Sequence, residues 1–162
     1  MGKNIKEISS GFTLVELMIV VALLGIVLAI AVPSINSTLD EMKLDSAAQE
    51  IVTATHYVQS LAIKEGVEHG VQFLLLTDTF KCYRNVAGNI ILNPINKKLF
   101  VVDFAAEGHL QGIDLVSTSL TGNRLEFSNL GEPSESGSIL LGYAGFQKTI
   151  TVSALLGKVS VN

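Results

Sequence analysis

Glu16 is a carboxylate near the start of a long apolar stretch, where a charge is costly unless it is paired. It follows Phe12 by four residues, which is about one turn of a helix. If the chain is cut after Gly11, Phe12 gains a free α-ammonium group. An ammonium on one helix could then pair with Glu16 on a neighbouring helix, which would set the axial register of a helical stack and offset much of the burial cost.

Other residues that could do chemistry are scattered along the chain. His56, His69 and His109 have no metal-ligand spacing with one another or with Cys82, so we expect surface or structural roles for all three. The single cysteine, Cys82, excludes an intramolecular disulfide. We expect it to be a half-buried strand residue, because free cysteines behave as small apolar residues.

The acidic residues also fail to form a recognisable site. Asp103, Glu107 and Asp114 lie in a turn-rich stretch and match no calcium-binding motif, so we interpret them as solvated loop charges. The sequence has no glycine-rich phosphate loop and no catalytic motif. We therefore predict no catalytic residue, no metal and no cofactor.

The apolar residues are concentrated near the N-terminus. Of the 162 residues, 48% are apolar, and the stretch from Phe12 to Val32 is interrupted only by Thr13 and Glu16. These 21 residues would be long enough as a helix to cross a bilayer. Lys3 and Lys6 precede the stretch, so the N-terminus is expected in the cytoplasm and the rest of the chain outside.

Three interpretations of this segment are possible. Ala29–Ala31 is a small-x-small pattern that a signal peptidase could cut, which would give a soluble protein starting at Val32. An uncleaved anchor helix is the second possibility. Neither needs a carboxylate at position 16, whereas a subunit that packs its helix among other helices does. Glu16 therefore favours the third interpretation, an assembling subunit.

The helical pattern continues beyond Pro33, which is expected to kink or loosen the helix. Apolar residues recur at steps of three and four on one side of the following segment: Leu44, Ala47, Ala48, Ile51, Ala54, Val58, Leu61 and Ala62. Gly66 is suited to cap the end. We predict one helix from about Phe12 to Glu65, apolar all round in its first half and one-sided in its second.

Short strand-like runs separated by turn residues follow the helix. Turns are predicted at Thr77–Thr79 and Leu155–Gly157, and a loop at Asn129–Gly137. The predicted strands are Val71–Leu76, Phe80–Asn85, Ile90–Leu92, Leu99–Phe104, Ile113–Ser117, Arg124–Ser128, Ser138–Tyr143, Thr149–Ser153 and Lys158–Val161.

The segment from Gly11 to Glu16 resembles the prepilin processing site of type IV pilins and type II secretion pseudopilins. The resemblance implies that a prepilin peptidase cuts between Gly11 and Phe12 and methylates Phe12. It also implies that Glu16 takes the place of the family's register-setting glutamate. Three further residues match the family's helix-packing positions: Leu17, Gly25 and Pro33.

The C-terminal part resembles GspH/FimT-type minor pilins and pseudopilins. The resemblance rests on Phe127–Pro133, followed by Ile139–Leu141, Thr149–Val152 and Gly157–Val159. It implies an α+β fold in which two small antiparallel sheets pack against the long N-terminal helix.

Two departures from the family pattern bear on function. The lone Cys82 excludes the C-terminal disulfide of many major pilins, which favours a minor subunit. Some FimT-like proteins bind DNA through a Gly-Arg-x-Arg element, whereas this chain has Lys158 and Ser160 at the two basic positions. The net charge is −4, and −5 without residues 1–11, so nucleic acid is not an expected partner.

The sequence thus predicts four parts: a cleaved leader (1–11), a transmembrane half-helix (12–33), an amphipathic half-helix (34–66) and an extracytoplasmic β-rich head (67–162). Expected partners are other pilin-like subunits, a prepilin peptidase and an inner-membrane assembly platform. The predicted role is structural, in a type II secretion pseudopilus or a type IV pilus, with a single pass through the bacterial inner membrane. The alternatives are a DNA-binding minor pilin for natural transformation and a membrane-tethered exported enzyme.

Overall fold

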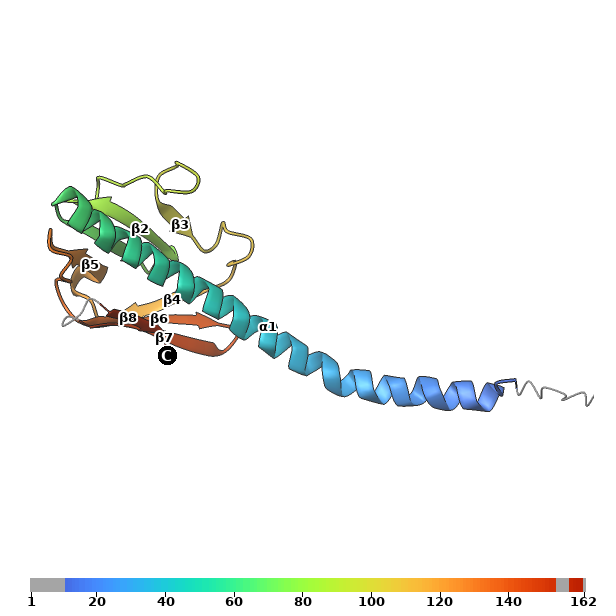
Figure 1. The fold of residues 1–162 in the computed structure, drawn as a ribbon. Helices are drawn as coiled ribbons and strands as arrows, with labels where there is room; N and C mark the ends of the chain where they lie inside the picture. The colour runs from blue at the N-terminus through green and yellow to red at the C-terminus, as the bar shows by residue number, and fades with distance from the viewer. Residues whose placement is uncertain (1–10, 154–157, 162) are drawn as a thin grey trace, which may run out of the picture. The chain divides into compact units, whose positions relative to one another are not determined.

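The computed structural model describes residues 11–153 and 158–161, without the side chains of 31–37 and 158. The elements follow one another in this order: α1 (Leu14–Glu65), β1 (His69–Leu74), β2 (Thr79–Arg84), β3 (Val101–Asp103), β4 (Asp114–Thr118), the 3-10 turn η1 (Thr121–Asn123), β5 (Arg124–Phe127), β6 (Gly137–Tyr143), β7 (Phe146–Ser153) and β8 (Lys158–Val161). Figure 1 shows them along the chain.

α1 is a single helix of 52 residues, as the periodicity predicted. The chain divides between Thr38 and Leu39 into two compact units, so α1 contributes to both. The helix ends where Gly66 adopts a positive φ of 66° and its N–H donates to the Ala62 carbonyl at 3.0 Å. Glycine tolerates this left-handed conformation, and the predicted cap at Gly66 is confirmed.

The strands form two four-stranded sheets in which all neighbours are antiparallel. The first sheet has the order β3-β2-β1-β5 and the second has the order β4-β6-β7-β8. In the first sheet Val71 lies between Cys82 and Leu125, and in the second Ile139 lies opposite Ile150. The predicted α+β fold with two antiparallel sheets is confirmed.

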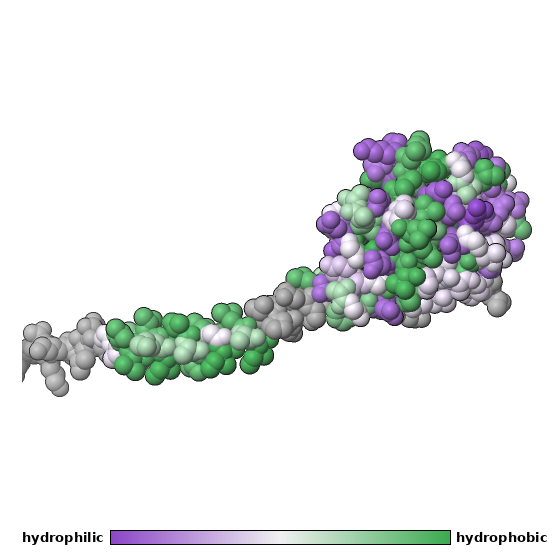
Figure 2. Space-filling model, turned by 180° about the vertical axis from the view of Figure 1, so that it is seen from behind, coloured by the Kyte–Doolittle hydropathy of each residue, from purple (hydrophilic) through white to green (hydrophobic). Residues whose placement is uncertain are grey.

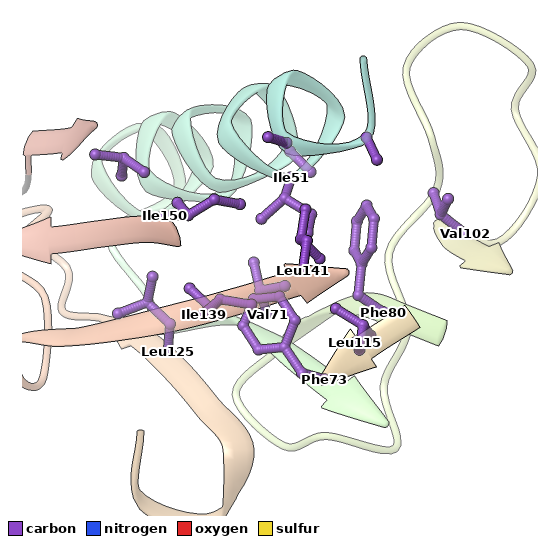
Figure 3. Close-up of a cluster of buried hydrophobic side chains, with 14 of the residues drawn as sticks. Ile51, Val71, Phe73, Phe80, Val102, Leu115, Leu125, Ile139, Leu141 and Ile150 are labelled. Carbon is purple, nitrogen blue, oxygen red and sulfur yellow. The ribbon is translucent and has the colours of Figure 1, made fainter. Parts of the chain in front are cut away.

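The second half of α1 forms one wall of the hydrophobic core. The predicted stripe is buried from Leu44 to Ala62, except that Leu61 is half-buried. Figure 3 shows Ile51 of α1 near Leu141 and Ile150 of the second sheet, with Val71 and Phe80 of the first sheet completing the cluster. Burial of this stripe supplies most of the stability of a surface helix.

One predicted strand, Ile90–Leu92, is wrong. Ile90 and Leu92 make only isolated bridges, to Tyr83 and to Leu99. The edge of β2 is shared, because Cys82 accepts from the Ile91 N–H at 3.0 Å and donates to the Phe100 carbonyl at 3.0 Å. The Ile90–Leu92 segment therefore does not extend into a ladder along β2, whereas the chain after Phe100 does, as β3. The predicted turn at Leu155–Gly157 lies outside the described residues.

Candidate assembly site at the start of α1

Thr13 and Glu16 form a reciprocal cap at the start of α1. The Thr13 hydroxyl oxygen accepts from the Glu16 N–H at 3.2 Å. Glu16 Oε2 in turn accepts from the Thr13 N–H at 3.0 Å and from the Thr13 hydroxyl at 2.8 Å. This is a capping box, and the spacing Thr-x-x-Glu is visible in the sequence and would have predicted it. Thr13 is therefore a residue that the sequence reasoning missed.

The cap gives Glu16 partners within its own chain. Its carboxylate remains exposed, as are Gly11 and Phe12, and Phe12 has a fractional exposure of 75%. The structure thus leaves the Gly11–Phe12 peptide bond accessible. Pairing of Glu16 with the ammonium group of another subunit stays a prediction.

The first half of α1 exposes apolar side chains on all sides. Every described residue from Leu14 to Ile30 is exposed, and Leu17 is 59% exposed. A Cβ added at Gly25 would meet nothing within 4 Å. Figure 2 shows this part of the helix covered by hydrophobic residues. Such a surface needs a partner, either lipid or other apolar helices.

No helix in the described part of the chain combines the length and the hydropathy needed to span a membrane. Pro33 lies within α1, but its side chain is outside the described residues. The transmembrane role of residues 12–33 and the kink at Pro33 therefore stay predictions.

The histidines occupy three different environments. His56 is exposed on α1, and His109 is exposed with its Nε2 4.0 Å from Glu50. His69 is fully buried, with Nδ1 3.0 Å from the Val67 carbonyl and Nε2 3.5 Å from the Glu65 carboxylate. His69 therefore lies between the last residue of α1 and the start of β1, where its surroundings indicate a structural role, and its Nε2 has no hydrogen-bond partner among the described residues.

Of the three carboxylates predicted to be solvated loop charges, Asp103 binds backbone, whereas Glu107 and Asp114 are exposed. Asp103 Oδ1 accepts from the Ala105 N–H at 2.8 Å, which closes the turn after β3. Within residues 11–153 and 158–161, no three potential metal ligands are grouped to hold an ion.

The surroundings of Cys82 and Lys148 indicate structural roles for both residues. Cys82 is fully buried rather than half-buried, because it faces the core from β2, and burial raises the pKa of its thiol far above the usual value. Lys148 forms an ion pair with Asp45 of α1. The DNA-binding alternative predicts a basic patch near Lys148 and Lys158, and the side chain of Lys158 lies outside the described residues.

Comparison with known proteins identifies the N-terminal motif. The model of the family described as "Prokaryotic N-terminal methylation motif" matches residues 8–32. No curated protein sequence is detectably similar to the chain.

Solved structures identify the fold. The minor pseudopilin EpsH from the type 2 secretion system of Vibrio cholerae matches with a TM-score of 0.56 and 16% identity, over 73% of this chain and 94% of EpsH. The type IV minor pilin FimU of Pseudomonas aeruginosa matches in two crystal forms. Their TM-scores are 0.52 and 0.55, with 16% and 17% identity, over 73% and 76% of this chain and 91% and 90% of FimU.

These matches confirm the resemblance to pilin-like proteins at two independent places. The motif match covers the start of α1, and the structural matches cover about three quarters of the chain. The chain therefore carries the prokaryotic N-terminal methylation motif and has the fold shared by the minor pseudopilin EpsH and the minor pilin FimU.

Proposed function

We propose that this chain is a structural minor pilin or pseudopilin, which assembles through α1 with other pilin-like subunits. The observation that carries the proposal is the methylation motif at the start of a helix whose described side chains from Leu14 to Ile30 are all exposed. A helix that exposes so many apolar side chains is suited to pack among other helices.

The proposed sequence of events starts in the bacterial inner membrane. Residues 12–33 anchor the precursor with its N-terminus in the cytoplasm and its head, residues 67–162, on the other side. A prepilin peptidase cuts after Gly11 and methylates Phe12. An assembly platform then transfers the helix from lipid to a filament, where Leu17 and the following apolar residues pack against other subunits.

Glu16 has a specific part in this transfer. In the single chain its carboxylate is held by the Thr13 N–H and hydroxyl, which keeps the charge satisfied before assembly. In the filament the new ammonium group of Phe12 on a neighbouring subunit replaces these donors and sets the register. The carboxylate thus exchanges neutral donors for a cation, and charge-assisted hydrogen bonds are the stronger kind.

The first test is the N-terminus of the protein extracted from membranes of its host, read by mass spectrometry. The expected mature chain begins with N-methylated Phe12. Gly11→Val should abolish processing, whereas Gly2→Val, a glycine change within the same leader, should leave it unchanged. A mature chain that begins at Val32 would show signal-peptidase cleavage and overturn the proposal.

The second test identifies the machine. Deletion of the gene should impair either protein secretion with pili intact, which indicates a type II secretion pseudopilin, or pili and twitching with secretion intact, which indicates a type IV minor pilin. Glu16→Gln should fail to restore the lost activity, whereas Glu41→Gln, an exposed carboxylate further along α1, should restore it. Loss of DNA uptake alone would favour the DNA-binding alternative.

A further inference from the structure

The head has an apolar groove between α1 and the connection that joins β2 to β3. Its volume is about 430 Å³. The α1 side includes Glu50, Thr53 and Tyr57, and the other side includes Ile95 and Phe100. The Tyr57 and Phe100 rings lie 6.0 Å apart between centroids and tilted by 47°, so two aromatic side chains shape the groove.

The rim of the groove carries an unusually exposed isoleucine in a well-defined loop. The Asn93–Lys98 loop is closed by bonds from the Asn93 N–H to the Lys98 carbonyl at 2.8 Å and from the Lys97 N–H to the Asn93 carbonyl at 3.0 Å. The Asn93 side chain also accepts from the Ile95 N–H at 2.9 Å. This bonding holds Ile95 at 89% exposure, so its apolar side chain is presented to solvent by a structured turn.

The loop and the groove carry opposite charges. Lys97 and Lys98 are exposed, and neither has an ion-pair partner among the described residues. Burial in the groove raises the pKa of Glu50, and nearby Glu107 raises it further, whereas His109 lowers it. The only basic side chain paired with Glu50 in the described residues is the His109 imidazole, with Nε2 at 4.0 Å. A lysine brought close to the Glu50 carboxylate would therefore stabilise its charged form.

We propose that the groove binds the Asn93–Lys98 loop of a second copy of this chain. Ile95 of each copy enters the groove of the other beside Tyr57, while Lys97 and Lys98 face Glu50 and Glu107 of the other copy. Because the loop is itself one wall of the groove, the same patch serves on both copies, which is the condition for a two-fold contact.

The proposal rests on the proposed function, because the contact area is small. A single loop in a groove of this size buries less surface than a stable free dimer needs. Subunits held by their helices in one membrane meet at high effective concentration, which allows such a contact to form. The charge complementarity then selects which faces meet.

The contact can be tested by disulfide formation between differently tagged full-length chains. One chain carries Ile95→Cys and the other Thr53→Cys, an exposed position in the groove. Both are expressed in the host membrane and oxidised there. The control replaces Ile95→Cys by Leu76→Cys, which is fully exposed and does not line the groove. Native Cys82 is buried and remains unreactive in the folded chain.

We expect the disulfide to form about tenfold faster for the Ile95→Cys chain than for the Leu76→Cys chain, because only the former is held at the groove. Adding Lys97→Glu and Lys98→Glu to the loop chain should slow the reaction about tenfold, and Glu50→Lys in the groove chain should restore it. Equal rates for the two cysteine chains, or no effect of the charge changes, would overturn the proposal.

The two proposals fail in different ways. If the disulfide is slow while the same membrane preparation contains chains that begin with methylated Phe12, the contact between copies is wrong and the proposed function stands. If the chains are not processed after Gly11, the proposed function fails, and the ratio of disulfide rates still decides the contact.

Discussion

The two halves of α1 differ in the exposure of their apolar side chains. From Leu14 to Ile30 every described side chain is exposed, whereas from Leu44 to Ala62 the apolar stripe is buried against two sheets. The second half also carries polar residues on its other side, such as Lys43 and Asp45, which the stretch from Leu17 to Ile30 lacks.

This difference separates folding from assembly within one helix. The second half packs against its own head, so the size and shape of its buried side chains are constrained by the close packing of the core. The described side chains of the first half are all exposed, so its apolar surface is available to lipid or to other helices. Substitutions in the two halves should therefore change different measurable properties.

The largest expected effect comes from truncating one isoleucine in each half. Ile51→Ala should lower the free energy of unfolding of the head by about 2–5 kcal/mol, because it leaves a cavity in the core. Ile26→Ala, at a side chain that is 60% exposed, should change it by less than about 0.5 kcal/mol.

Both variants can be measured on the full chain in detergent through Cys82. Its thiol is buried and the only one in the sequence, so its labelling by a thiol reagent in denaturant reports opening of the head. Equal destabilisation by Ile26→Ala would contradict the separation of folding from assembly, because it would show that the first half also stabilises the head.

The sequence predicted the elements that depend on periodicity. The stripe from Leu44 to Ala62 and the cap at Gly66 could be read directly, because helix spacing and the positive φ of glycine are local properties. The two-sheet arrangement came from the resemblance to the GspH/FimT group, since strand patterns do not specify which strands pair.

The segment between β2 and β3 could not be predicted in the same way. Ile90–Leu92 has strand-like residues, but two segments compete for the same edge of β2, and this competition is visible only in three dimensions. The exposure of Ile95 is equally invisible, because it depends on hydrogen bonds within a loop. The Thr13–Glu16 cap, in contrast, has a clear local spacing.

A pair of glycines gives the second test of the comparison. A Cβ at Gly131, where φ is 80°, would lie 2.6 Å from Cδ1 of Ile63 on α1, whereas a Cβ at Gly25 would meet nothing within 4 Å. Gly131→Ala should destabilise the head by about 1–2 kcal/mol, mainly through the left-handed backbone, since the half-exposed Ile63 can move aside. Gly25→Ala should leave Cys82 labelling unchanged and favour the helix by about 1 kcal/mol.

Gly25→Ala also has an assembly readout. If other helices approach closely at Gly25, the variant should assemble poorly in the host although its head is as stable as that of the parent chain. Normal assembly would show that this position is only a tolerated glycine, and the predicted packing role of Gly25 would be wrong.

A smaller effect is expected at the polar edge of the second half. Asp45 pairs with Lys148, and the two side chains are 53% and 25% exposed. Asp45→Asn should therefore cost the head no more than about 1 kcal/mol, and the loss should shrink at high salt. A loss that is the same at low and high salt would show that Asp45 acts through packing and not through its charge.

The smallest effect concerns the pH dependence at Glu50. Burial raises the pKa of Glu50 in the folded head, so above that pKa the folded state carries a desolvation cost that the unfolded state lacks. Below the usual value of 4.5 the carboxyl is protonated in both states and the cost is absent. Glu50→Gln should therefore stabilise the head at pH 7, and this gain should disappear as the pH falls below 4.5.

The gain is expected to be on the order of a few tenths of a kcal/mol, because a side chain about one third exposed is screened by solvent. The matched control is Glu41→Gln, an exposed carboxylate on the same helix. If lysines of a second copy face Glu50, the gain should also shrink when the chains are concentrated in one membrane, since the partner's cation then offsets the desolvation. A gain that is independent of concentration would show that Glu50 does not meet the lysines of a second copy.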